Sequence, residues 1–306
     1  MDPHLEELLR SIIGADPSVV LDDEKRKAIT YAMLGMQSAA NLEAVFGFVS
    51  SIQDEAKRSI LLHALVPRFA SVLQHKRAKE IADSIPVPYW RWTSVINIAS
   101  DLLERDRATG GPNTGFRREA IELIREAEQS LPLVAEEDGD RATIVWRAGL
   151  ALVKAGELDW AEALAESSTY CAEHTEVLLR IAKDRASRGE AERARKILHR
   201  VANLARSGEN DLTNRAFDLQ EAGELAAELG EEASGRQYLD AALAIALKSQ
   251  GQDIDGAKCV GAIALSLAKQ GSIEVAREAA GKITQRIRRE RTLQSILEMS
   301  QNTKRK

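Results

Sequence analysis

One spacing of small residues recurs through the second half of this sequence and constrains its fold more than any other feature. A glycine or alanine is followed seven residues later by a glycine and, after five more residues, by another glycine or alanine. Small residues that recur in register, and not merely in abundance, indicate copies of one structural unit. The four copies are Gly149, Gly156, Ala161; Ala182, Gly189, Ala194; Gly223, Gly230, Gly235; and Ala264, Gly271, Ala276.

The residues around this spacing predict a helical hairpin in each copy. Apolar residues stand four and one positions before the first small residue, as Leu178 and Ile181 do before Ala182. A stripe at intervals of three and four is typical of a helix that packs against a neighbour. The first small residue lets a returning helix come close, and we expect the small residue twelve positions later to face it. The central glycine can adopt the left-handed conformation that ends a helix, and the glutamate that follows it in three copies suits the start of the next helix.

This pattern resembles the tetratricopeptide-type (TPR) repeat, which has a small residue, a turn residue seven later and an alanine five further on, in units of about 34 residues. The resemblance covers most of the chain. It implies an all-α fold, a right-handed α-solenoid of stacked antiparallel helical hairpins. The sequence departs from the family in two ways, because aliphatic residues replace the aromatic pair of the first helix and most units lack the closing proline.

We predict a single solenoid over residues 1–306, in four stretches. These are degenerate N-terminal helices and hairpins at 1–87, a hairpin with an inserted loop at 107–114 within 88–136, four clear hairpins at 137–284, and a capping helix with a basic tail at 285–306. In the capping helix, Ile296 and Leu297 are expected to face inward. The loop is expected because the two small residues of its hairpin are nine residues further apart than in the clear copies.

The hairpin expected near residues 54–85 is the poorest match. Val66 and Ala78 keep the twelve-residue separation, but Leu73 stands where the clear copies have glycine. Pro67 is expected to interrupt the first helix of this hairpin, since proline lacks the N–H that a helix interior uses.

Composition and charge exclude several classes of protein. Hydrophobic residues make up 44% of the chain but aromatic residues only 4%, a mixture that favours close helix packing over a β-sandwich. The formal net charge of −5 argues against a nucleic-acid binder. The exception is residues 281–306, with eight Lys or Arg against two Glu, so a nucleic-acid-associated adaptor that uses this helix is an alternative function.

Cysteine usage and the N-terminus indicate a cytoplasmic protein. Cys171 and Cys259 are too few and too far apart for a disulfide framework. Residues 1–10 are acidic and lack the layout of a signal peptide. The longest apolar run, residues 260–268, is far shorter than the roughly 20 residues of a membrane helix.

No catalytic, cofactor-binding or metal-binding residues are predicted. Cys171 and His174 share one helix face, but two ligands make only half a zinc site, and a structural role for both is the preferred interpretation. A catalytic helical-repeat protein is the least favoured of the three functions.

The predicted function is a non-enzymatic scaffold or regulatory subunit that binds another protein. In the family's geometry the concave groove is lined by first-helix positions three before and one after the small residue. These positions and the nearby tryptophans give the predicted groove residues Trp146, Leu150, Leu179, Lys183, Trp90 and Trp92. An apolar strip of this kind suits a peptide or helix of a partner, while a purely structural role for Trp146 in the core remains open.

Two substitutions follow from the predicted register. Ala194→Leu is expected to destabilise the fold by about 1–3 kcal/mol through overpacking. Gly235→Ala is expected to be neutral or to stabilise by up to ~1 kcal/mol, because glycine is unfavourable inside a helix.

Overall fold

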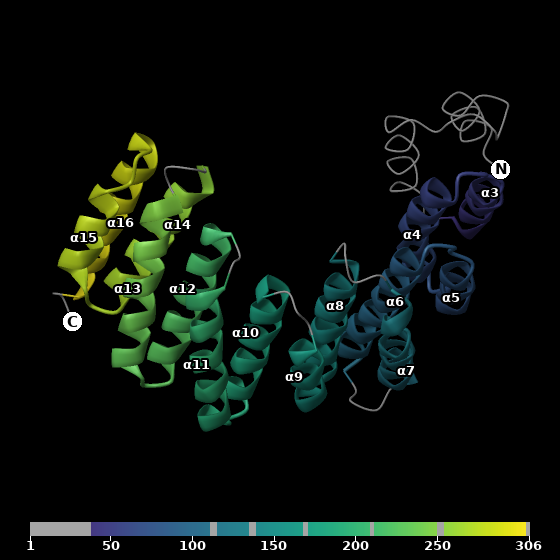
Figure 1. Ribbon diagram of the computed structural model, residues 1–306, viewed down its shortest axis with the longest axis horizontal. Coiled ribbons are helices and arrows are strands. Elements are labelled where there is room, and N and C mark those ends of the chain that lie inside the picture. Colours follow the sequence, from purple (N-terminus) through teal and green to yellow (C-terminus); the bar gives the residue numbers. More distant parts are fainter. Residues whose placement is uncertain are drawn as a thin grey trace. The chain divides into compact units, whose positions relative to one another are not determined.

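The computed structural model describes residues 38–110, 115–134, 139–167, 171–208, 211–249 and 254–303. In this part of the chain all regular structure is helical (Figure 1), so the all-α class is confirmed. The chain divides into two compact units, residues 1–157 and 158–306, which are treated separately below. A single continuous stack through both units therefore stays a prediction, and the helices expected before residue 38 lie outside the described residues.

Unit 1 is organised around its longest helix. It contains α3 (Ala39–Ser50), α4 (Glu55–Ser71), α5 (His75–Asp83), α6 (Pro88–Ala108), α7 (Gly115–Gln129), the short 3-10 helix η1 (Leu131–Leu133) and α8 (Asp140–Ala155). Helix α6 contacts α4, α5, α7 and α8. It begins at Pro88, where the missing N–H and fixed φ of proline suit the first turn. Its residues Ile96 and Ile98 are almost completely buried, so α6 forms the centre of this core.

Unit 2 is a stack of hairpins. It contains α9 (Leu158–Glu166), α10 (Cys171–Ser187), α11 (Ala191–Ser207), α12 (Leu212–Glu228), α13 (Glu232–Ser249), α14 (Ile254–Lys269), α15 (Ile273–Gly281) and α16 (Arg286–Thr303). The first helices of successive hairpins contact each other, α10 with α12 and α12 with α14. Each also contacts its own second helix, α11, α13 or α15, while α16 packs against α14 and α15. This connectivity is that of an α-solenoid.

The central glycines of the four clear copies all adopt the predicted left-handed conformation. Their φ angles are 80° at Gly156, Gly189 and Gly271 and 81° at Gly230. In each turn the N–H of the following residue donates to the carbonyl five residues earlier, at 2.9 Å. These bonds satisfy carbonyls that the end of a helix leaves unpaired.

Leu73 forms the same turn without a glycine. Its φ is 66°, and the N–H of Gln74 donates to Phe69 O at 3.0 Å, as in the glycine turns. Its side chain is 68% exposed. The degenerate hairpin α4–α5 therefore keeps the turn geometry of the clear copies, although a side chain in this conformation is unfavourable by about 1–2 kcal/mol.

The predicted pairs of small residues are buried where they can be compared within one unit. Ala182 and Ala194 are fully buried between the contacting helices α10 and α11, and Ala264 and Ala276 between α14 and α15. The apolar positions before them, such as Leu178 and Ile181, are fully buried as well. Gly149 and Ala161 belong to different units, so their contact stays a prediction.

The third pair shows why glycine is needed twice in one hairpin. A Cβ atom added at Gly235 would lie 2.7 Å from Gly223 O, and one added at Gly223 would lie 2.9 Å from Gly235 O. The two residues therefore face each other as predicted, with backbone against backbone. The expectation that Gly235→Ala is neutral or stabilising is wrong, because backbone atoms leave no room for the methyl group.

Three further expectations are corrected. Pro67 does not interrupt α4: it lies on the exposed side of the helix, and the fully buried Val66 and Phe69 hold the last turn against the core. The first two residues of the expected loop 107–114 belong to the last turn of α6, where the side chain of Arg107 donates to Lys154 O at 3.0 Å. Residues 111–114 lie outside the described residues.

In the capping helix α16, Ile296 is fully buried as expected but Leu297 is 49% exposed. Consecutive side chains of a helix point about 100° apart, because one turn takes 3.6 residues. The two residues therefore cannot both face the core.

Candidate functional site

The predicted groove residues of unit 1 differ in accessibility. Trp92 is only 7% exposed and belongs mainly to the core. Trp90, Trp146 and Leu150 are half-buried and present part of their surface to solvent. The Trp90 ring packs against His63 of α4, with 4.9 Å between the ring centroids. Three of the four residues are therefore accessible to a partner.

His63 lies at the contact between the first helices of unit 1. Its Nδ1 is hydrogen-bonded to Ser94 Oγ at 2.9 Å. Burial and, to a lesser extent, the positive charge of Arg147 on α8 lower the pKa of His63 to about 4. The imidazole is therefore neutral at physiological pH and acts as a polar member of the core.

The two predicted groove residues of unit 2 also differ. Leu179 is only 2% exposed, whereas Lys183 is exposed and forms an ion pair with Glu221 of α12. The predicted strip runs from Trp146 and Leu150 in unit 1 to these two residues in unit 2. Its continuity across both units stays a prediction.

A half-buried carboxyl group, that of Asp218, lies between α10 and α12. Thr175 Oγ1 donates to Asp218 Oδ2 at 2.7 Å. Burial raises the pKa of Asp218 to about 6, and the nearby carboxylates of Glu221 and Glu176 act in the same direction, while the Thr175 hydrogen bond opposes them. The contact between these first helices is thus polar and acidic.

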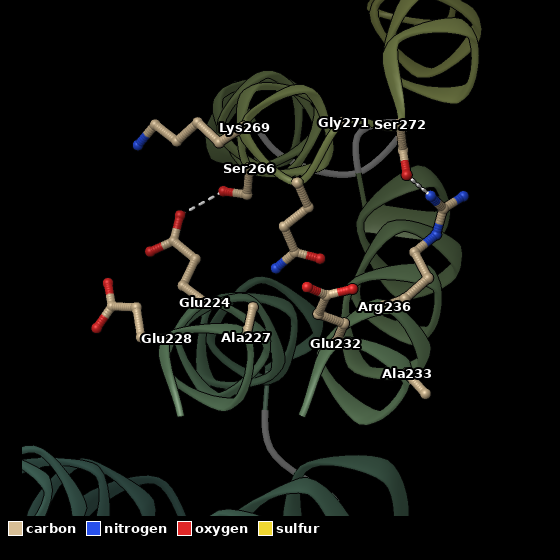
Figure 2. A pocket seen from close by; sticks show the side chains of 11 residues that line it. Glu224, Ala227, Glu228, Glu232, Ala233, Arg236, Ser266, Lys269, Gly271 and Ser272 are labelled. Atoms are coloured by element: carbon tan, nitrogen blue, oxygen red, sulfur yellow. Dashed lines mark hydrogen bonds between the residues drawn. The ribbon is translucent and has the colours of Figure 1, made fainter. Parts of the chain in front are cut away.

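A hollow lies in unit 2, where the ends of α12 and α14 meet the beginnings of α13 and α15 (Figure 2). It has a volume of about 830 Å³. We call it the α12–α15 cavity. It is lined by Glu224, Ala227 and Glu228 of α12, Glu232, Ala233 and Arg236 of α13, Ser266, Lys269 and Gln270 of α14, and Gly271 and Ser272 of the turn that follows.

Several of the lining side chains are held by neighbours. Glu224 accepts a hydrogen bond from Ser266 Oγ, drawn as a dashed line in Figure 2. Gln270 Nε2 donates to Gly223 O at 3.1 Å, and so ties α14 to α12. Arg236 donates to Ser272 Oγ across the cavity. These contacts fix the walls.

Three other charged side chains of the cavity are not held. Among the described residues, Glu228, Glu232 and Lys269 are exposed and have no hydrogen-bond or ion-pair partner. Figure 2 shows Glu224 and Glu228 on the α12 side and Lys269 on the α14 side. The cavity therefore offers charged groups of both signs that are neither hydrogen-bonded nor ion-paired within the described ranges.

A smaller cavity occupies the equivalent place in unit 1, between the ends of α6 and α8 and the start of α7. Its volume is about 250 Å³. Glu104 stands five residues after Ala99, the small residue of α6, and Lys154 stands five residues after Gly149 of α8. Glu228 and Lys269 have the same positions in α12 and α14. In unit 1 the pair is closed, with Lys154 Nζ 2.9 Å from Glu104 Oε1.

Other candidate chemistry is not supported by the geometry. Nowhere in the described ranges do three His, Cys, Asp or Glu side chains gather so that they could hold a metal ion. His174 is buried, and burial lowers its pKa, while the side chain of Cys171 lies outside the described residues. Of the helices described, none is long and apolar enough to cross a membrane.

The basic segment of the alternative function lies on α16. Arg286 pairs with Glu290 at 2.8 Å, and Arg289 donates to Ile283 O at 3.4 Å. Part of the positive charge of this helix is thus used within the chain. Residues 304–306 lie outside the described residues.

Comparison with known proteins yields no matching family model and no matching curated protein. Among solved structures, the chain is similar to the apo form of RapI, with a TM-score of 0.44, 15% identity, and coverage of 84% of this chain and 75% of that chain. It is also similar to a signal-transduction ATPase (STAND) protein with a tetratricopeptide repeat sensor from Pyrococcus horikoshii, with a TM-score of 0.38, 16% identity, and coverage of 92% and 42%. A de novo designed helical repeat protein gives a TM-score of 0.15, 17% identity and 98% coverage of both chains. The hairpins, glycine turns and paired small residues described above show a TPR-like helical-repeat architecture.

Sequence reasoning did not single out the charged residues of the α12–α15 cavity. In the hairpins around Trp146 and Leu179 the groove rule gives three apolar residues and one charge, that of Lys183. The same rule one hairpin later gives Glu224, one position after Gly223. The glutamates of α12 resemble any solvated helix face, and only the position of α14 shows that they line a cavity.

Proposed function

We propose that the chain is a non-enzymatic, protein-binding scaffold and that its α12–α15 cavity receives a segment of another protein. The observation that carries this proposal is a cavity formed by two consecutive hairpins, with charged side chains that have no hydrogen-bond or ion-pair partner in the described part of the chain. Surface charges of a structural helix are commonly paired along that helix, as Arg236 is with Asp240.

The lining favours a peptide over a small molecule. A volume of about 830 Å³ is within the range of ligand pockets. Pockets for small molecules, however, enclose their ligand, whereas this cavity is open to solvent, and most of its lining residues carry a charged, amide or hydroxyl group beside the apolar surface of their stems and of the alanines (Figure 2). A peptide supplies many polar groups and needs no enclosure, so it suits such a surface better.

The accessible groove residues predicted from the sequence belong to the same proposal as further contacts, one set on each unit. These are Trp90, Trp146 and Leu150 of unit 1, with Lys183 of unit 2. If the partner extends over them, Trp146→Ala should weaken binding strongly, since tryptophans at interfaces often contribute more than about 2 kcal/mol. Lys183→Glu should weaken binding while the melting temperature barely changes, because an exposed ion pair contributes little to folding.

The test of the cavity itself is a peptide selection with a matched pair of variants. A phage-displayed library of random peptides is selected on the full chain, and the enriched peptides are measured by fluorescence anisotropy. Ala227 lies on the cavity wall, so Ala227→Arg should obstruct the cavity. Ala186 has the same position in α10, four residues after the small residue, and is also half-buried. Ala186→Arg is therefore the control.

The proposal expects peptides that bind the wild type and Ala186→Arg but lose most of their affinity for Ala227→Arg. Melting temperatures of both variants show whether each is folded. Peptides that bind Ala227→Arg as tightly as the wild type would place the docking site elsewhere. Failure to enrich any peptide would contradict the scaffold function of this cavity.

A further inference from the structure

The α12–α15 cavity is lined by more negative than positive side chains, and one of the two positive side chains is already paired. Three carboxylates, those of Glu224, Glu228 and Glu232, line it. On the positive side, the Arg236 guanidinium is paired with Asp240 through Nε at 2.9 Å. Lys269 is thus the one cation of the lining without an acidic partner in the described structure.

The negative charge of Glu224 is not cancelled by its contacts. Its hydrogen bonds come from the hydroxyl of Ser266 and the amide of Gln220, both of which are neutral donors. Such contacts orient the carboxylate and leave its charge in place. Glu224, on the wall, and Glu228, one helical turn further along α12, therefore present two adjacent negative charges to an occupant.

In unit 1 the equivalent glutamate and lysine are paired with each other. There Glu104 and Lys154 form an ion pair at 2.9 Å, and the remaining cavity is about 250 Å³. In unit 2 the equivalent Glu228 and Lys269 are not within ion-pair distance, and the cavity is about 830 Å³. The open cavity thus retains a carboxylate that its counterpart neutralises internally.

From this charge pattern we infer that the segment received by the cavity carries lysine or arginine side chains, which contact Glu228 and Glu232. The inference rests on the proposed docking function and adds the chemistry of the partner. A long basic side chain can extend between the ends of α12 and α14, and an arginine can bind a carboxylate through two parallel hydrogen bonds. An acidic segment would instead meet three like charges, which disfavours binding.

The experiment uses three pools of short fluorescein-labelled peptides on the full chain. All pools mix glycine, serine and alanine at random, and they contain in addition lysine and arginine, aspartate and glutamate, or no charged residue. The basic pool should bind at low salt and weaken as salt is added, because these charges are partly exposed. The acidic and neutral pools should bind at least about tenfold more weakly, which corresponds to the loss of one charge-assisted contact.

Charge-neutralising variants assign the contact. Glu228→Gln and Glu232→Gln should each weaken the basic pool by about tenfold, and Lys269→Gln should strengthen it by removing a repulsion. Glu104→Gln changes the matched residue of unit 1 and should leave the affinity unchanged. Glu228 and Glu232 have no partner among the described residues, so both variants should stay folded. The melting temperature of Glu232→Gln should fall only slightly, because Glu232 lies in the first turn of α13, where the helix dipole favours a carboxylate.

The outcomes separate this inference from the proposed function. Equal binding of the three pools, or unchanged affinity in both glutamate variants, would overturn the basic-segment inference. If library peptides still depended on an unobstructed cavity, the docking function would stand without it. Weaker binding of the basic pool to Lys269→Gln would also overturn the inference, because it would show that the occupant is anionic there.

Discussion

The two units place the same pair of residue types at equivalent positions and use them differently. In unit 1, Lys154 and Glu104 of neighbouring first helices form an ion pair, and Lys154 also lines a small cavity. In unit 2, Lys269 and Glu228 face a larger cavity and remain apart. Residue type and repeat position are therefore insufficient to decide whether a charge stabilises a repeat or is available to a partner.

The units also differ in their buried titratable groups. At the contact of first helices, unit 1 has a histidine whose pKa is lowered to about 4, and unit 2 has an aspartate whose pKa is raised to about 6. Burial favours the neutral form of both groups, but the histidine is neutral above its pKa and the aspartic acid is neutral below its pKa. Acidification should therefore have opposite effects on the two contacts.

The largest expected effect tests this opposition. His63 binds a proton more readily when unfolded, so its contribution to stability is present above pH 6.5 and is lost as pH falls towards about 4. The loss should approach about 1.4 kcal/mol per pH unit within that window. The protection factors of the α4 and α6 amides in hydrogen exchange, which correct for the intrinsic effect of pH on exchange, should fall over this range in the wild type and much less in His63→Gln. Equal pH dependence in both proteins would contradict the assignment.

Asp218 should show the opposite pH dependence of stability. Its folded pKa is raised, so its contribution is present below pH 3.8 and is lost as pH rises through about 6. The difference in stability between the wild type and Asp218→Asn, measured by exchange in α10 and α12, should therefore become more favourable to the wild type as pH falls from 6 to 4. No change in that difference would show that Asp218 is solvated.

The second prediction concerns how closely helices approach in the two kinds of hairpin. Gly235→Ala places a methyl group 2.7 Å from Gly223 O and should destabilise the chain by about 1–3 kcal/mol through overpacking. Ala194 has the same position in α11, already carries a Cβ and is fully buried. Ala194→Gly should also destabilise the chain, by about 1 kcal/mol, but through lost packing and backbone entropy instead of overpacking. An unchanged melting temperature for Gly235→Ala would mean that α12 and α13 can move apart freely.

The third prediction compares the turns. Leu73→Gly should stabilise unit 1 by about 0.5–1 kcal/mol, since glycine removes the unfavourable left-handed leucine. Gly230 has the same turn conformation in unit 2, with φ of 81°, and Gly230→Leu should destabilise by about 1–2 kcal/mol. Urea denaturation measures both. A destabilised Leu73→Gly would show that the exposed leucine makes a contact that outweighs the backbone strain.

The smallest effect sharpens the opening comparison. Glu104→Gln breaks the partly exposed ion pair with Lys154 and should destabilise by less than about 1 kcal/mol. Glu228→Gln, at the equivalent position, should have no effect on the melting temperature because Glu228 has no partner to lose. A larger fall in melting temperature for Glu228→Gln than for Glu104→Gln would show that Glu228, and not Glu104, contributes to the stability of the fold.

Most of the fold could be predicted from local sequence because the hairpin turn is a local structure. A glycine seven residues after a small residue determines where one helix ends, and all four such glycines have the expected φ. Leu73 shows the limit of this signal, since tertiary packing holds the same turn without glycine. Pro67 shows the same limit. It lies on the solvent-facing side of α4, and the neighbouring residues in the sequence do not indicate which side of the helix faces solvent.

The candidate site was less predictable than the fold. The spacing rule locates first-helix positions, but Trp92 and Leu179 at or near such positions are buried. Burial depends on helices that are distant in sequence, and so does the cavity that Glu228 and Lys269 line. Gly235 illustrates the same difficulty in the core: helix propensity predicted a tolerated alanine, and the carbonyl of Gly223 excludes it.

Cys259 gives the chain an internal reporter of motion. It is fully buried on α14, and burial raises the pKa of its thiol to about 12. Since the thiolate is the species that reacts, alkylation at neutral pH requires α14 to open transiently. In a Cys171→Ser background the alkylation rate would therefore measure how often this helix opens. An occupant of the cavity that α14 lines should lower that rate.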